Sequence, residues 1–160
     1  MKKPVRRKAA EAVTIRPATA ADLPGVIALD QETTGLAKPE YWQESFRRHG
    51  GRPGGGSGGG GHFLVARAED RVEGFIVGEV RAWEFGSSPC GWVFAVQVRP
   101  GRRLRGLGSR LFAAVCAAFR DDGVDRVRTM LARDNTVIHA FFRSQGMTAG
   151  PFIQLEARLD

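Results

Sequence analysis

The sequence alternates between short apolar segments and segments in which apolar residues recur every three or four positions. Residues 12–17 have strand composition, and residues 62–68 and 71–83 flank a turn at 69–70. This pattern is typical of a strand and, later in the chain, of an antiparallel hairpin. Residues 92–98 are apolar at six of seven positions. We therefore expect that segment to be a strand covered on both faces.

Helical periodicity marks four further segments. They are residues 18–30, 40–48, 109–122 and 135–146. Side chains that accept hydrogen bonds from helical N–H groups lie at the first of them (Thr19 and Asp22) and at the last (Asn135 or Thr136). Gly123 follows the third segment and is expected to close it.

Two more segments, 126–132 and 152–159, have the composition and alternation of strands. Strands and helices then follow one another in a mixed order. The sequence therefore predicts a mixed α/β fold with a largely antiparallel central sheet, a strand-helix-strand crossover at 92–132 and helices on both faces.

Length and composition favour one domain over residues 12–160, because 160 residues with 42% hydrophobic content can bury a single core. Residues 1–11 are predicted to be a basic flexible tail. Residues 50–61 hold nine glycines and one proline in twelve positions. Such a segment has little apolar surface to bury, so we expect a flexible surface loop.

The net charge of +7 suggests a nucleic-acid partner, but its distribution weakens that interpretation. Residues 1–10 hold five of the 24 basic residues, which leaves 19 basic against 17 acidic residues in the rest of the chain. Nucleic acid is therefore expected to bind at most weakly, through the tail. Two cysteines form no disulfide framework, and no apolar run approaches a membrane span or follows the basic N-terminus as in a secretory signal, so we expect a cytoplasmic protein.

Residues 102–110, RRLRGLGSR, join the strand at 92–98 to the following helix. The first N–H groups of a helix lack partners within it, and the helix dipole is positive at that end, so an anion placed there is stabilised. Glycines allow close approach of the backbone to phosphate, and arginines add charge-assisted contacts. The spacing fits neither a dinucleotide fingerprint nor a Walker loop. The junction therefore predicts either a pyrophosphate site or an ordinary tight turn, in which glycines are also common.

The order of VQVRP, the R-x-x-G-x-G turn, its helix and the later NTVIHAFFRSQGM resembles the GNAT superfamily of acyl-CoA-dependent N-acyltransferases. The opening TIRPATAADLPGVIALD is similar to the usual start of that family, and the resemblance covers about residues 12–159. It implies acetyl-CoA as the co-substrate and no metal. In the family, the backbone matching Val96, Gln97 and Val98 pairs with the pantetheine arm and helps to polarise the thioester carbonyl.

The resemblance also assigns the remaining cofactor contacts. The pyrophosphate would be held by Arg103, Leu104, Arg105, Gly106, Leu107 and Gly108, and Asn135 matches the asparagine that usually contacts the cofactor. Phe142 stands where family members often have a tyrosine that acts as general acid, and it is assigned to packing against the core or the cofactor. Family members often carry a glutamate on the fourth strand that acts as the general base, but this strand offers only Phe94, Ala95 and Gln97.

Other residues are therefore candidates for the proton transfers. Glu79 and Glu84 could act as bases through water or simply be solvated carboxylates. Tyr41, the only tyrosine, lies in a helix that borders the acceptor site in this family, and it could donate a proton or pack. His139 could be an acid, a structural residue or an exposed one.

The leading hypothesis is an N-acetyltransferase that moves acetyl from acetyl-CoA to a primary amine of a small molecule, peptide or protein. A first alternative is an acyl-CoA-binding or partner-binding domain without turnover, because the usual tyrosine and glutamate are missing. A second is contact with nucleic acid or the ribosome through the basic tail. Many relatives pair, so a homodimer is also considered, and the acceptor is not identified by the sequence.

Overall fold

The computed structural model describes residues 12–50, 60–103 and 106–159. The chain divides into two compact units, Met1–Thr129 and Met130–Asp160. The predicted tail at residues 1–11 lies outside the described residues, as does the part of the glycine-rich segment from 51 to 59.

The first unit is built on one five-stranded sheet with the strand order β1-β2-β3-β4-β5. Its strands are β1 (Val13–Pro17), β2 (Gly61–Ala68), β3 (Arg71–Arg81), β4 (Cys90–Val98) and β5 (Val127–Arg128). The first four strands pair with one another in antiparallel fashion, and β5 runs parallel to β4. The predicted mixed α/β fold, with its hairpin and its crossover after β4, is confirmed.

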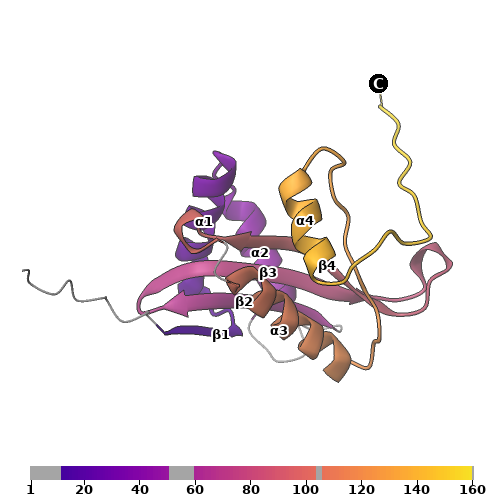
Figure 1. Ribbon diagram of the computed structural model, residues 1–160. Helices are drawn as coiled ribbons and strands as arrows, with labels where there is room; N and C mark the ends of the chain where they lie inside the picture. Colours follow the sequence, from indigo (N-terminus) through magenta and orange to yellow (C-terminus); the bar gives the residue numbers. More distant parts are fainter. Residues whose placement is uncertain (1–11, 51–59, 104–105, 160) are drawn as a thin grey trace, which may run out of the picture. The chain divides into compact units, whose positions relative to one another are not determined.

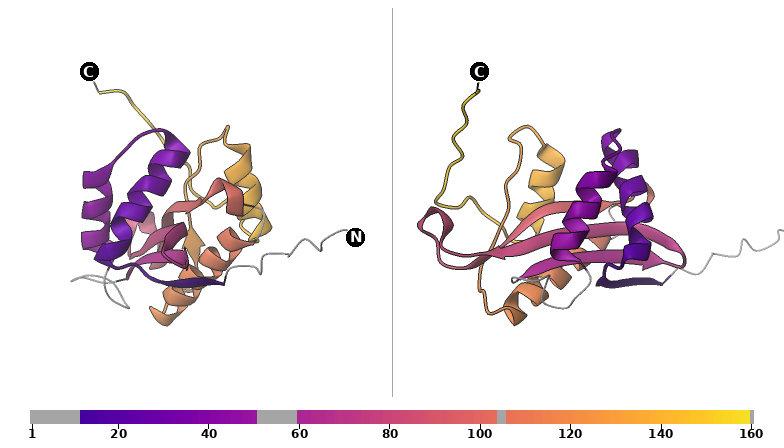
Figure 2. Two further views of the ribbon diagram at one scale, coloured as in Figure 1. Left: turned by 90° about the vertical axis from the view of Figure 1, so that its left-hand side faces the viewer. Right: turned by 180° about the vertical axis from the view of Figure 1, so that it is seen from behind.

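Helices cover both faces of this sheet, as predicted. They are α1 (Leu23–Thr34), α2 (Pro39–His49) and α3 (Leu107–Asp121), with short 3-10 turns η1 (Ala20–Asp22), η2 (Glu84–Gly86) and η3 (Pro100–Arg102). In Figure 1, α3 lies in front of the sheet and α1 and α2 lie behind it. The right-hand view of Figure 2 shows α1 and α2 in front.

The core beneath α1 and α2 is aromatic and aliphatic. It contains Ala18, Val26, Leu29, Trp42, Phe63, Val65, Val72, Phe75 and Val77. Trp42 of α2 meets the ring of Phe75 edge to face, with 4.9 Å between centroids. Edge-to-face pairs of buried aromatic rings add to the stabilisation from burial alone, so α2 is fixed on β3.

The opposite face of the sheet admits α3 because two glycines make room for one phenylalanine. A Cβ on Gly91 would lie 2.4 Å from Cδ2 of Phe119, and a Cβ on Gly78 would lie 2.8 Å from its Cζ. These distances are shorter than any van der Waals contact between carbon atoms. The fully buried Phe119 ring therefore lies against the bare backbone of β3 and β4.

Helix ends follow the predicted signals. Thr19 and Asp22 form a capping box at the start of η1, and Asp22 is also the N-cap of α1. Gly123 takes φ +83° after α3, where its N–H donates to the carbonyl of Arg120 at 2.9 Å. Only glycine adopts this left-handed conformation without strain, so the predicted close of α3 is confirmed.

The second unit contains α4 (Thr136–Ser144), and Asn135 is its N-cap, accepting a hydrogen bond from the N–H of Ile138 at 3.2 Å. The strand predicted at 152–159 is wrong: the described residues there form no strand. Ile153 and Leu155 are 83% and 86% exposed. Alternation favours a strand only where a ladder partner and a buried face are available, and the described part of this unit contains no other strand.

Two predictions for the first unit also need correction. The strand predicted at 126–132 is much shorter, because β5 comprises only Val127 and Arg128. Residues 92–98 do form a strand, but its second half is not covered on both faces, and Phe94 is 42% exposed. No helix among the described residues is long and apolar enough to cross a membrane.

Candidate functional site

The parallel strands β4 and β5 separate soon after they begin to pair. β5 pairs with β4 only at Gly91 with Val127 and at Trp92 with Arg128. On its other side β4 stays paired with β3 as far as Val98, which lies opposite Gly74. Among the described strands, none pairs with the β5-facing edge of residues 94–98. An exposed strand edge can bind an extended ligand, because the unpaired N–H and C=O groups of the strand can form hydrogen bonds with the ligand.

A β-bulge lies where this edge begins. Ala95 pairs with Val77 and Val93 pairs with Gly78, so Phe94 is an extra residue in β4. Bulges bend a strand and are frequent beside active sites. The bulge therefore interrupts β4 next to the segment that was predicted to pair with pantetheine.

The glycine-arginine junction ends at the N-terminus of α3. Gly106 is the N-cap with φ +74°, and a Cβ placed on it would meet nothing within 4 Å. The first intrahelical hydrogen bond runs from the N–H of Arg110 to the carbonyl of Gly106 at 3.0 Å. The N–H groups of the first turn, from Leu107 and Gly108, precede that bond and are the ones that bind anions in other helices. Leu104 and Arg105 lie outside the described residues.

The described arginines of the junction have different partners. Arg103 is exposed, and its Nε donates to the carbonyl of Val98 at 3.2 Å. Arg110 instead donates to the carbonyl of Val13 at 2.8 Å and so ties α3 to β1. Of these two, Arg103 is the one held at the end of β4, beside the open edge.

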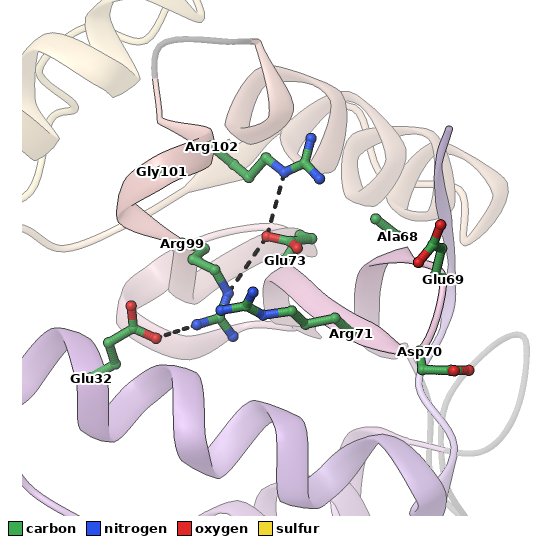
Figure 3. A pocket seen from close by; sticks show the side chains of 9 residues that line it. All are labelled: Glu32, Ala68, Glu69, Asp70, Arg71, Glu73, Arg99, Gly101 and Arg102. Atoms are coloured by element: carbon green, nitrogen blue, oxygen red, sulfur yellow. Dashed lines mark hydrogen bonds and ion pairs between the residues drawn. The ribbon is translucent and has the colours of Figure 1, made fainter. Parts of the chain in front are cut away.

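Charged residues anchor the start of the junction around a pocket of about 590 Å³ (Figure 3). Glu73 of β3 is 4% exposed and lies 3.5 Å from Nε of Arg99 and 3.6 Å from Nε of Arg102. Arg99 also pairs with Glu32 of α1. These contacts join α1, β3 and η3, and they fix the chain where it leaves β4 for the predicted phosphate site.

A second buried carboxylate, on α1, fixes the position of β4. Asp30 of α1 is 1% exposed and accepts hydrogen bonds from Nε1 of Trp42 at 2.8 Å and Nε2 of Gln97 at 2.7 Å. Nζ of Lys38 lies 2.9 Å away. Burial alone would raise the pKa of Asp30, but these donors outweigh it and lower that pKa. Asp30 is therefore an anion that holds α1, α2 and β4 together.

The structure brings two of the predicted bases together. Glu79 of β3 and Glu84 of η2 both face Arg81, at 2.8 Å and 3.8 Å from its Nε. Tyr41 of α2 is 49% exposed and packs edge to face against Trp42. Among the described residues, no contact is found between Tyr41 and Glu79, Glu84 or Arg81.

The remaining predicted residues belong to the second unit. Nε2 of His139 lies 3.1 Å from the carbonyl of Ala132. Phe142 is 3% exposed and its ring meets that of Phe141 edge to face. Asn135 is the N-cap of α4, and the cofactor roles that the resemblance gives to Asn135 and Phe142 stay predictions.

His49, the last residue of α2, was not among the site residues predicted from the sequence. Its Nδ1 lies 3.8 Å from Oε2 of Glu79, and its ring centroid lies 5.2 Å from that of Phe94 at the bulge. Thirty residues separate His49 from Glu79 in the chain. The helical spacing that predicted α2 gives no information on this contact, which depends on how α2 crosses the sheet.

Comparison with known proteins identifies the family. The profile of the GNAT family of acetyltransferases matches residues 24–147. That match spans most of the chain, so the protein belongs to the GNAT family. No curated protein sequence matches it significantly.

Solved structures show the same fold at low identity. The aminoglycoside N-acetyltransferase AAC(6')-Iy in complex with CoA is 17% identical with a TM-score of 0.77, and the match covers 97% of this chain and 99% of that one. AAC(6')-IG from Acinetobacter haemolyticus is 18% identical (TM-score 0.71, covering 92% and 99%). A transcriptional regulator from Bacillus halodurans is 16% identical (TM-score 0.73, covering 92% and 100%).

Proposed function

We propose that this protein transfers an acetyl group from acetyl-CoA to a primary amine of a small molecule, peptide or protein. The observation that carries the proposal is the open β4 edge at Val96–Val98 ending beside the N-terminus of α3. The edge suits an extended pantetheine arm, and the helix N-terminus suits a pyrophosphate. Membership of the GNAT family supports acetyl transfer.

Each part of this site has a separate task. Arg103 and the N–H groups of Leu107 and Gly108 would bind the pyrophosphate, and the backbone of Val96–Val98 would align the pantetheine arm. Acetyl-CoA supplies the acetyl group already activated as a thioester. The protein must then position a neutral amine beside it, and positioning alone can account for much of the acceleration.

Substitution of the glycines tests the phosphate site. We expect Gly106→Glu and Gly108→Glu each to weaken acetyl-CoA binding at least about tenfold, equal to about 1.4 kcal/mol, because a carboxylate would occupy and repel the anion site. Isothermal titration calorimetry measures the affinity. Glutamate in the first turn suits the helix dipole, so Gly108→Glu is not expected to unfold α3.

Two variants separate charge from backbone strain. Gly106→Ala places a side chain at the same φ of +74° without a charge, and Gly123→Glu places the same charge at φ +83° beyond the other end of α3. Both are expected to bind acetyl-CoA more tightly than Gly106→Glu. Unchanged affinity in both glutamate variants of the junction would contradict the site.

An acyl-CoA-binding domain without turnover is the second candidate. It is favoured by Phe94 at the bulge and by Phe142, two side chains that exchange no proton. Release of free thiol from acetyl-CoA, measured across a panel of primary amines that includes polyamines, aminoglycosides and peptides, distinguishes the two. Turnover with any of these amines supports the transferase, and binding of acetyl-CoA without turnover supports the second candidate.

A further inference from the structure

His49 lies where three elements meet. It ends α2, and a Cβ placed on Gly61 of β2 would lie 2.7 Å from its Nδ1. Its ring packs beside that of Phe94 of β4, with the two ring planes inclined at 59°. Its side chain is 11% exposed. The imidazole is thus fixed by packing on Gly61 and Phe94, next to the bulge in β4, and its side chain is not fully buried.

Burial, more than the surrounding charges, lowers the pKa of this imidazole and so favours its neutral form. Burial lowers the pKa of His49 below its ordinary value of 6.5; Glu79 raises it, and Arg48 and Arg81 lower it further. Of these groups, Arg48 belongs to α2, and Glu79 and Arg81 belong to β3. The contacts from β4 and β2 are uncharged, being Phe94 and Gly61. A neutral imidazole has a lone pair that can accept a proton.

The proposed reaction needs such a group. Primary amines are mostly protonated at neutral pH, and an ammonium has no lone pair with which to attack a carbonyl carbon. Family members often use a glutamate on the fourth strand as the general base, whereas this chain has Phe94, Ala95 and Gln97 there. Gln97 is bound to Asp30, and neither other side chain accepts a proton. The imidazole that touches Phe94 is therefore well placed to replace that glutamate.

We propose that His49 is the general base that deprotonates the acceptor amine, with Glu79 as the positioning residue behind it. The carboxylate of Glu79, 3.8 Å from Nδ1, would stabilise the imidazolium through its charge, and Nε2 would accept the proton. In the step, an N–H bond of the acceptor ammonium breaks and a new N–H bond forms at Nε2. The positive charge moves from the amine to the imidazole, the amine nitrogen keeps the electron pair, and the proton then passes to solvent. This inference rests on the proposed acetyl transfer.

Proton NMR of the free protein tests the charge state independently of activity. The chain has only three histidines, so substitution of each assigns the three ring signals. We expect the His49 signal to titrate below pH 6.5, and lower still in Glu79→Gln, because the carboxylate stabilises the imidazolium. A midpoint at or above 6.5, or one unmoved by Glu79→Gln, would overturn the proposal.

Kinetics then test the role. With the best amine from the thiol-release panel, we expect His49→Gln to lower kcat/KM by about 10²- to 10⁴-fold and to leave the Kd for acetyl-CoA unchanged. Glu79→Gln is expected to shift the acid limb of the kcat/KM profile to lower pH together with the NMR midpoint. If His49 were merely structural, Glu79→Gln would not shift the NMR midpoint of His49 and the acid limb of the kcat/KM profile together.

His62→Gln is the matched control, because it removes an imidazole that contacts Asp122 and Phe119 instead of Glu79 and Phe94, and it is expected to keep both the rate and the pH profile. His49→Gln that retains wild-type kcat/KM, or that loses acetyl-CoA binding, would overturn the inference. Failure of the wild-type protein to bind acetyl-CoA, or to turn over with any amine, would instead contradict the proposed function, and the inference with it.

Discussion

At the residue scale, the start of the fold depends on one buried carboxylate. Asp22 is 1% exposed and accepts hydrogen bonds from Arg16 and Arg67, each at 2.7 Å, and from the N–H of Thr19 at 2.8 Å. Burial opposes its ionisation, but these donors outweigh burial and hold the pKa of Asp22 well below its ordinary value. Asp22 thereby ties the start of α1 to β1 and β2.

Asp22→Asn is expected to destabilise the protein by about 3–5 kcal/mol, because it breaks a buried ion pair and leaves two guanidinium groups without their anion. Urea unfolding at pH 7 measures the change. Glu44→Gln is the control, since Glu44 also binds two arginines but on the surface of α2. It should cost far less, because exposed ion pairs contribute little. Equal losses would contradict this account.

The same carboxylate makes stability depend on pH. The pKa of Asp22 is lower in the folded state than the value of about 3.9 in an unfolded chain. Its contribution is therefore present above about pH 4 and is lost as the pH falls through the folded value. We expect the free energy of unfolding to decline in acid for the wild type and to decline less for Asp22→Asn. Urea unfolding at pH 7, 5 and 3 compares the two slopes.

At the scale of elements, the packing of α3 on β3 and β4 determines where the N-terminus of α3 lies. Gly91→Ala is expected to destabilise the fold by about 1–3 kcal/mol, because its methyl group would overlap the Phe119 ring. Gly101→Ala is the matched control, since a Cβ there meets nothing within 4 Å. Urea unfolding measures both variants.

A double substitution localises that effect. Phe119→Leu removes ring atoms from the crowded position, so the loss in Gly91→Ala with Phe119→Leu should be smaller than the sum of the two single losses. Strict additivity would show that the alanine acts elsewhere than on Phe119.

Also at this scale, the sequence predicted element types better than strand lengths. The apolar composition of 126–132 indicated a strand, yet β5 ends at Arg128. The length of a strand is set by its neighbour's ladder, and β4 is bulged at Phe94 just beyond the paired residues. A bulge depends on two strands together, so neither sequence segment alone reveals it.

At the scale of the whole molecule, charge is distributed unevenly along the chain. Removal of residues 1–10 lowers the net charge from +7 to +2, since it removes five of the 24 basic residues and no acidic ones. We expect this deletion to abolish the salt-dependent part of any RNA binding, because counterion release scales with the number of phosphates neutralised. Fluorescence anisotropy with a single-stranded RNA at several salt concentrations measures it. An equally steep salt dependence without residues 1–10 would place the RNA contact on the domain itself.

The sequence by itself determined the order of the elements as far as α4, their caps and the glycine-arginine junction before α3. These features are local: helical periodicity, cap side chains and left-handed glycines act over a few residues, so one stretch of chain contains the whole signal. The same local signals allowed the resemblance to the GNAT family, which the family profile confirmed.

Only the tertiary structure decided which distant groups meet. The separation of β4 from β5, the anchoring of Gln97 by Asp30 and the contact of His49 with Glu79 and Phe94 all join segments tens of residues apart. Such contacts depend on strand register and on the angle at which each helix crosses the sheet, which many side chains determine jointly. For that reason His49 could be recognised as a neighbour of Glu79 only from the folded chain, although Glu79 itself was among the predicted bases.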